Sequence, residues 1–440
     1  MRRFLATAAA VLSFSAMAIT PVSASSAPPA GMPSFYSVPT FSPKAALGTV
    51  LKYQPQAVAG LVGGIAYQVM YITENYLHKR VPATGFIVVP TGTTPKNGFP
   101  VLDWNHGTNG MTSVCAPSLY IHNEIEMDAM NAIMAKGWEI TAADYQGEGT
   151  AGLMPYLAGI SAAQDSINIV RAAHTAKLSG KALPFHASTT YVDWGHSEGG
   201  QTAMFVAKIG HSYAPDLTLK GVAAGAPPSQ FRYIYSVLKT SPYGFYLLMA
   251  AAGLNAWYGN TLAPLSQILT SLSTAMIPDL SKGCSSVISG DVAPYIANGT
   301  FGQLTQGDPY NNAAWVKILN ANDPGMILNL AAPLLIYQGG IDEQIPVAST
   351  GLLNQGLCGL PKVSTPGHPA LRGSVQRWIY PGQSHSGVIG KSYVDMLNWL
   401  TYQFANNPTA ASAYVPVGLQ GVAPSASTND SAGFSELQSC

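Results

Sequence analysis

The pentapeptide Gly195-His196-Ser197-Glu198-Gly199 places one serine in a turn suited to nucleophilic attack. β-Branched and aromatic residues at 189–194 predict a strand before it, and residues 200–208 predict a helix after it. A serine held in a strained backbone conformation at such a turn needs glycine two positions away on either side, because larger side chains would clash. A glycine-rich turn that carries a serine by chance would look the same, so the interpretation depends on the partners of Ser197.

A serine hydroxyl is a weak nucleophile and needs a histidine base that a carboxylate orients. After Ser197, residues 332–338 predict a buried strand that leads to Asp342, and residues 375–380 predict a strand that leads to His385. Ligands bind at the carboxyl edge of open α/β sheets, so we expect both side chains at that edge. The chain order serine, acid, histidine is that of the α/β-hydrolases. We predict Ser197, Asp342 and His385 as the catalytic residues.

Two of these assignments have an alternative. Glu343 adjoins Asp342 and would supply the carboxylate if the loop turned the other way, although the first acid after the strand is the usual one. His368 competes with His385, but it lies between Gly367 and Pro369 and follows no predicted strand.

Ester cleavage also needs N–H donors for the negatively charged oxygen of the tetrahedral intermediate, the oxyanion hole. One donor is expected from Glu198, the residue after the serine. Residues 99–104 predict a strand that leads into a loop of Asn, His and Gly residues, and the second donor is expected at Gly107 or Thr108. An ordinary Asn- and Gly-rich turn is the alternative for this loop.

The composition points away from several classes of partner. The 440 residues carry 21 basic and 21 acidic side chains, and no basic patch indicates a nucleic-acid partner. The sequence has no phosphate-binding loop, no H-E-x-x-H and no Cys or His pair at zinc spacing, so we expect no metal and no other cofactor. Hydrophobic residues at 47% and 22 tyrosines indicate a large core and an apolar, tyrosine-rich binding surface.

The first 24 residues resemble a secretory signal peptide. Arg2 and Arg3 precede an apolar stretch at 4–19, and small residues at 22–24 offer a cleavage site after Ala24. Phe4 follows the arginines directly, which favours the general export route over the twin-arginine route. Elsewhere no run reaches the roughly 18 apolar residues of a spanning helix, so we expect a secreted protein, periplasmic or extracellular. Any contact with a lipid–water interface would then be transient, with no stable membrane anchor.

The remaining chain divides into five parts. We expect an extended arm at 25–47, a core at 48–227, a helical insertion at 228–324, the rest of the core at 325–416 and a low-complexity tail at 417–440. Within the core, predicted strands (84–89, 99–105, 138–143 and 219–226) alternate with predicted helices (123–136 and 161–177), which indicates a mostly parallel, doubly wound sheet.

The insertion is rich in helical and aromatic patterns, with helices expected over 245–258 and 262–276. It falls between the strand after Ser197 and the strand before Asp342, so we expect it over the catalytic edge as a cap. The fold class is therefore an α/β-hydrolase with an inserted helical cap. An apolar lid for acyl chains and a helical subdomain that buries its own apolar face are compatible interpretations of this segment.

The four cysteines (Cys115, Cys284, Cys358 and Cys440) predict two disulfides in an exported protein, with three pairings open. Free buried thiols are the alternative. Cys440 suggests that the tail, which otherwise has a disordered composition, is tied down.

Several of these segments together resemble the secretory lipase family, the secreted fungal and bacterial lipases of the lipase A type, over about residues 48–404. They are residues 115–118 (Cys-Ala-Pro-Ser), 143–149, 195–200, 213–217 and 340–346. The resemblance implies an α/β-hydrolase core with a cap and hydrolysis of carboxylic esters, acylglycerols included. It also implies Ser197, Asp342 and His385 as the triad, and disulfides from Cys115 to Cys284 and from Cys358 to Cys440.

The chain departs from that family at two places. The loop reads His106-Gly107-Thr108, where the yeast members have an acidic residue, and the tail differs from the segment that forms a flap in those members. Acyl-chain length and oligomeric state stay open. A short-chain carboxylesterase, an acyltransferase on the same scaffold and a catalytically inactive secreted binding protein are the alternatives.

Overall fold

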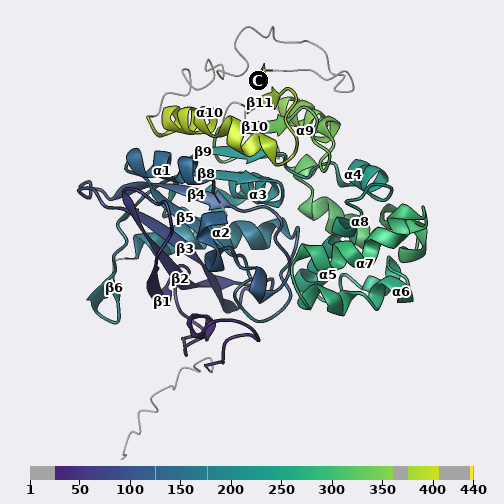
Figure 1. Cartoon of the computed structure of the whole chain (residues 1–440), viewed down its shortest axis with the longest axis horizontal. Helices are drawn as coiled ribbons and strands as arrows, with labels where there is room; N and C mark the ends of the chain where they lie inside the picture. Colours follow the sequence, from purple (N-terminus) through teal and green to yellow (C-terminus); the bar gives the residue numbers. More distant parts are fainter. Residues whose placement is uncertain (1–24, 124, 176, 360–374, 406–436, 440) are drawn as a thin grey trace, which may run out of the picture.

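A computed structural model describes residues 25–123, 125–175, 177–359, 375–405 and 437–439. A ten-stranded sheet in the order β1-β2-β3-β5-β4-β8-β9-β10-β11-β12 runs through it (Figure 1). Its strands are β1 (Val50–Gln56), β2 (Gly64–Glu74), β3 (Arg80–Pro90), β4 (Phe99–Asn105), β5 (Glu139–Ala143), β8 (Ala187–His196), β9 (Thr218–Gly225), β10 (Leu334–Gly339), β11 (Val375–Tyr380) and β12 (Leu437–Ser439). A separate hairpin pairs β6 (Lys177–Leu178) with β7 (Lys181–Ala182).

In the order of the sheet, the neighbouring strands β5, β4, β8, β9, β10 and β11 are parallel to one another. Strands β1, β2 and β3 at one margin and β12 at the other are antiparallel to their neighbours. The parallel part confirms the predicted α/β class, since connections between parallel strands must cross over through helices. Sequence patterns alone did not reveal the antiparallel strands β1 and β2. They extend the sheet beyond β3 as antiparallel neighbours, which hairpins connect, so no helical pattern in the sequence separates one strand from the next.

Helices cover both faces of the sheet. On one face lie α2 (Gly159–His174), α3 (Glu198–Tyr213) and α9 (Val347–Cys358), and on the other lie α1 (Met127–Ala135) and α10 (Gly387–Phe404). Successive strand residues alternate between the two cores: Tyr191 packs with the α2 and α3 side, and Val192 with the α1 and α10 side. This two-sided burial explains why the central strands are nearly continuous apolar runs.

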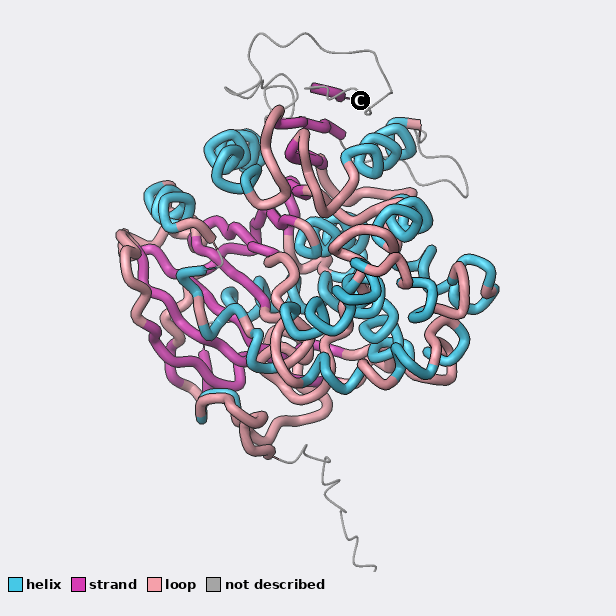
Figure 2. Tube along the Cα trace, turned by 45° about the vertical axis from the view of Figure 1, so that its right-hand side comes forward, coloured by secondary structure: helices cyan, strands magenta, loops and turns pink. Residues whose placement is uncertain are grey.

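Residues 228–324 form a group of helices beside the sheet, on the right of Figure 1. The view of Figure 2 brings that side of the molecule forward. They are α4 (Phe231–Leu238), α5 (Phe245–Tyr258), α6 (Ser271–Thr274), α7 (Ser285–Ala297) and α8 (Ala313–Asn322). The bounds of α5 are those predicted. The continuous helix predicted over 262–276 is wrong, because Pro264 interrupts it and Thr270 caps the short α6 by accepting the N–H of Ser273.

The arm at 25–47 packs onto the core through Tyr36. Its ring is buried, and its hydroxyl lies 2.7 Å from Oγ of Ser118 and accepts Nε2 of Gln68. The predicted signal peptide (1–24) and nearly all of the predicted tail lie outside the described residues. Within the described ranges, every helix is too short or too polar to cross a membrane.

Candidate active site

Ser197 lies in the turn between β8 and α3, with φ of 59° and ψ of −122°. Its N–H donates to the carbonyl of Gly225 at 2.8 Å, which fixes the turn against the end of β9. A Cβ on Gly195 would lie 2.1 Å from the carbonyl oxygen of Gly199, and a Cβ on Gly199 would lie 2.0 Å from that of Asn105. Both positions therefore require glycine, for the steric reason expected from the sequence.

Asp342 and His385 lie together at the ends of the neighbouring strands β10 and β11. Oδ2 of Asp342 is 2.9 Å from Nδ1 of His385, and both side chains are buried. The N–H of Ile341 donates to the carbonyl of Gln383, which joins the two loops. Glu343 instead accepts the backbone N–H of His385 at 3.0 Å, and His368 lies outside the described residues.

His385 approaches the serine turn through His196. The two imidazole rings lie with their centroids 4.5 Å apart, and His196 is the residue before Ser197. Burial, with the nearby His385 as a second cause, lowers the pKa of His196 well below its usual range. His196 is therefore neutral near pH 7 and adds no positive charge beside His385.

The backbone of the loop after β4 passes close to Ser197. A Cβ on Gly107 would lie 3.6 Å from Cβ of Ser197 and 3.5 Å from the carbonyl oxygen of His196. Glu198 is the first residue of α3, where backbone N–H groups have no partner within the helix. The two segments expected to form the oxyanion hole thus border the serine from two sides.

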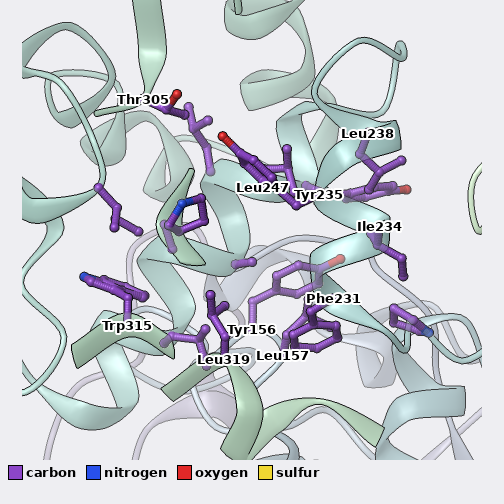
Figure 3. A pocket seen from close by; sticks show the side chains of 18 of the residues that line it. Tyr156, Leu157, Phe231, Ile234, Tyr235, Leu238, Leu247, Thr305, Trp315 and Leu319 are labelled. Atoms are coloured by element: carbon purple, nitrogen blue, oxygen red, sulfur yellow. The ribbon is translucent and has the colours of Figure 1, made fainter. Parts of the chain in front are cut away.

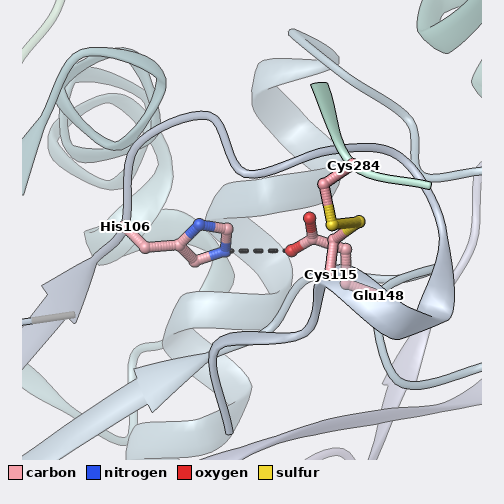
Figure 4. The surroundings of a disulfide bond; sticks show 4 residues. All are labelled: His106, Cys115, Glu148 and Cys284. Carbon is pink, nitrogen blue, oxygen red and sulfur yellow. Dashed lines mark ion pairs between the residues drawn. A yellow bond between two sulfur atoms is a disulfide. The ribbon is translucent and has the colours of Figure 1, made fainter. Parts of the chain in front are cut away.

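Within this loop, the buried side chain of His106 contacts the buried side chain of Glu148. Nε2 of His106 lies 3.3 Å from Oε2 of Glu148 (Figure 4). Nδ1 of His106 lies 2.7 Å from the carbonyl oxygen of Gly107. The ring of Tyr145 stacks on His106 with centroids 4.2 Å apart. Burial lowers the pKa of His106 to about 4, so the imidazole is neutral near pH 7.

The disulfide between Cys115 and Cys284 ties the same loop to the start of α7 (Figure 4). Beside it, Gly110 and Cys284 form an isolated antiparallel bridge, and the N–H of Ser285 donates to the carbonyl of Asn109. This pairing is the one that the family resemblance implies. Cys358 is also disulfide-bonded, whereas Cys440 lies outside the described residues.

An apolar cavity lies between the turn that carries Ser197 and the helices of residues 228–324 (Figure 3). It contains about 960 Å³ of empty space, the open solvent at its mouth included. Ser197 and Glu198 line it together with side chains of α4, α5 and α8, among them Phe231, Leu247, Leu254, Trp315 and Leu319. An unbranched apolar group next to Ser197 would be enclosed by side chains of the same polarity.

Three residues of this neighbourhood were not expected from the sequence: Glu148, Tyr156 and His196. Glu148 lies between Gly147 and Gly149 in a motif shared with the resembled family, which was the available signal. No sequence signal pointed to Tyr156, because only the fold brings its hydroxyl to Oγ1 of Thr108, 2.9 Å away.

A strained serine at the carboxyl edge of a doubly wound sheet, with an acid and a histidine following on later strands, is the arrangement of the α/β-hydrolases. Residues 114–411 match the secretory lipase family. The chain therefore belongs to the secretory lipase family and, with it, to the carboxylic ester hydrolases.

Individual relatives are distant. A secreted triacylglycerol lipase of Malassezia furfur is 22% identical over 69% of this chain and 58% of its own length. A protein of Mycobacterium tuberculosis described as a probable inactive lipase is 27% identical, but the match spans less than half of each chain, 44% of both. The crystal structure of Candida antarctica lipase A in its closed state has the same fold, with a TM-score of 0.64 at 16% identity, over 82% of this chain and 83% of that one.

Proposed function

We propose that this protein is a secreted serine hydrolase that cleaves carboxylic esters, acylglycerols among them, through an acyl-enzyme on Ser197. The single observation that carries the proposal is the contact between Asp342 and His385, beside a serine in the strained turn that nucleophiles of this fold occupy. Family membership and the secreted triacylglycerol lipase among the relatives support the substrate class and secretion.

In the proposed reaction His385 takes the proton of Ser197 as its Oγ attacks the ester carbonyl. Asp342 holds the imidazole in the tautomer that leaves Nε2 free to accept, and it stabilises the imidazolium that forms. The N–H groups of Glu198 and of Gly107 or Thr108 hold the oxyanion, and each such donor lowers the barrier by about 3–4 kcal/mol in other hydrolases. His385 then protonates the leaving alcohol, and water releases the acid from the acyl-enzyme.

We assign the apolar cavity as the site of the acyl chain and the helices of residues 228–324 as the cap that encloses it. The position of the cavity supports this assignment, because Ser197 lines it together with mainly apolar side chains, many of them from α4, α5 and α8. An acyl group bonded to Oγ of Ser197 would have its chain directed into an environment without competing water.

A serine-directed phosphonate probe tests the proposal directly. We expect stoichiometric labelling of the wild type at Ser197, no labelling of Ser197→Ala, and loss of nearly all turnover in that variant with an unchanged unfolding temperature. Retained turnover in Ser197→Ala would refute the assignment. Absence of both labelling and turnover in the folded wild type would favour an inactive binding protein; the Mycobacterium tuberculosis relative is described as a probable inactive lipase.

The alternatives on the same scaffold are a short-chain carboxylesterase and an acyltransferase. Hydrolysis rates for esters of increasing acyl length separate lipase from esterase, because a long-chain optimum requires the cavity to take up the chain. An acyltransferase would form more transfer product than free acid when a second alcohol is supplied.

A further inference from the structure

A row of buried polar side chains joins β10 to α9 and β11, next to the predicted catalytic acid. Its members are Gln338 of β10, Thr350 of α9 and Arg377 of β11, and all three are fully buried. Ile336, two residues before Gln338, pairs with Arg377 in the sheet and packs in the same core as Leu353 of α9. Because side chains alternate along a strand, Gln338 and Arg377 both project from the face that α9 covers.

The amide of Gln338 is hydrogen-bonded to the acid itself. Its Nε2 donates to Oδ2 of Asp342 at 3.0 Å and to the carbonyl oxygen of Ile345 at 2.7 Å. A backbone carbonyl can only accept, so the NH2 group of the amide must face this side. Oδ2 is also the oxygen 2.9 Å from Nδ1 of His385, whereas the N–H groups of Gln344 and Ile345 donate to Oδ1. Gln338 is therefore the side chain that holds the second oxygen of the acid.

The oxygen of the same amide is held by Thr350. The hydroxyl of Thr350 donates to Oε1 of Gln338 at 2.5 Å. Its single proton is then used, so Oγ1 accepts Nε of Arg377 at 3.1 Å. The carbonyl oxygen of Val347, which also lies 3.1 Å from Oγ1, accepts Nη2 of Arg377 at 2.9 Å. The guanidinium thus supplies donors to both oxygens and leaves the Thr350 proton to Gln338.

These hydrogen bonds have one direction. An arginine stays charged over the usual pH range and only donates, so the row runs from Arg377 through Thr350 and Gln338 to Asp342. An amide of Gln338 turned by 180° would place its oxygen against two acceptors, the Ile345 carbonyl and the Asp342 carboxyl. Buried polar groups without a partner cost more than a formed hydrogen bond contributes, so the row fixes the observed orientation. Hydrogen bonds that run in one direction also strengthen one another.

We propose that Gln338 is a positioning residue for Asp342. Thr350, itself held by the buried guanidinium of Arg377, fixes the Gln338 amide in the orientation that donates to the acid. This inference rests on the proposed ester hydrolysis, in which Asp342 orients His385. It extends the proposed catalytic set from three side chains at the strand ends to a support that reaches into α9 and β11.

Gln338→Met tests the contact with the acid, because it keeps the length of the side chain and removes the donor. We expect kcat to fall about 10- to 100-fold with KM within about twofold, since a displaced carboxyl orients His385 poorly but leaves the cavity unchanged. The loss should stay below the roughly 10⁴-fold expected for Asp342→Asn, in which the acid itself is lost. Steady-state kinetics with a soluble ester gives both constants, and the unfolding temperature shows whether the variant is folded.

Thr350 provides a second route that leaves the Gln338 side chain in place. Thr350→Val removes the hydroxyl at nearly constant volume and should lower kcat about 3- to 10-fold, the effect of one lost hydrogen bond. Thr350→Ser keeps the hydroxyl and should retain most of the wild-type kcat. The double variant Gln338→Met/Thr350→Val should have the kcat of Gln338→Met within about twofold, because Thr350 acts through Gln338.

Ser349 offers the matched control. It is a buried hydroxyl of the same helix, and its Oγ donates to the carbonyl oxygen of Pro346 at 2.8 Å. Ser349→Ala should lower the unfolding temperature as Thr350→Val does, while kcat stays within about twofold of the wild type. Arg377→Met should lower kcat in the wild type and leave it unchanged in Thr350→Val. If Arg377→Met does not fold, the Gln338 and Thr350 variants decide alone.

Four results would overturn the inference. They are full kcat in Gln338→Met, equal losses in Thr350→Ser and Thr350→Val, a loss of kcat in Ser349→Ala as large as that in Thr350→Val, and an additive double variant. Phosphonate labelling of the wild type keeps the two proposals apart. A wild type that is folded, unlabelled and inert contradicts the proposed function itself. A wild type labelled at Ser197, with Gln338 variants that turn over normally, contradicts the positioning role alone.

Discussion

The carboxylate of Asp342 lies within 3.0 Å of Nδ1 of His385 through both of its oxygens. Oδ1 also accepts the N–H groups of Gln344 and Ile345, and Oδ2 accepts Nε2 of Gln338. Three donors of its own loop and strand therefore hold the carboxylate in place before it meets the ring. A fixed carboxylate acceptor at Nδ1 orients a histidine so that it can act as base through Nε2.

The first prediction compares the two neighbouring acids. Asp342→Asn should lower kcat by about 10⁴-fold, because the amide favours the wrong tautomer of His385. Glu343→Gln is the matched control: its amide oxygen can still accept the backbone N–H of His385, so we expect less than about a tenfold loss. Steady-state kinetics with a soluble ester gives both values. A larger loss in Glu343→Gln would assign the role to Glu343.

The second prediction concerns the disulfide. Replacing Cys115 and Cys284 together by serine should lower the free energy of unfolding by about 2–5 kcal/mol, since the bond closes a long loop of the unfolded chain. It should also lower kcat, because the bond anchors the loop that borders Ser197. Denaturant unfolding and ester hydrolysis measure the two effects. Equal stability of the variant and the wild type would contradict the first, and an unchanged kcat the second.

The third prediction is a pH dependence of stability. Glu139 is fully buried in β5, accepts the N–H of His186 through Oε2, and burial raises its pKa to about 8. Its contribution to stability is complete below the unfolded pKa of about 4.3 and is lost as the pH rises through the folded pKa. Between those two pKa values the free energy of unfolding falls by at most about 1.4 kcal/mol for each pH unit.

Glu139→Gln cannot ionise and should escape that loss. We expect its unfolding temperature to exceed that of the wild type at pH 9 by a few degrees, and the difference to shrink toward pH 5. Calorimetry at both values provides the test. A difference independent of pH would mean that Glu139 does not titrate in this range.

The fourth prediction addresses the cavity. Leu319 of α8 lines the cavity (Figure 3), so Leu319→Trp would reduce the space in it, and we expect long acyl chains to be obstructed more than short ones. We expect the ratio of long-chain to short-chain kcat/KM to fall about tenfold or more. Leu328→Trp, at a position 60% exposed outside the cavity lining, is the control and should leave the ratio unchanged. The same change of this ratio in both variants, or no change in either, would exclude this cavity as the acyl site.

Local sequence patterns were enough to predict much of this fold and several residues of its candidate active site. The strand and glycines around Ser197 forecast the serine turn because the steric demands of that turn are met by adjacent residues. The strand at 375–380 and the helix at 245–258 have the bounds predicted, since each is a contiguous run of one pattern. The positions of Asp342 and His385 followed from one topological rule about the ends of parallel strands.

Only the tertiary structure decided which groups from distant parts of the chain meet. It brought Glu148 to His106 and Tyr156 to Thr108, and it left the carboxyl of Glu198 buried without a normal partner. It also chose Asp342 over Glu343 for the ring of His385. Burial and pairing of this kind depend on packing between segments far apart in sequence, and no local period or propensity records that packing.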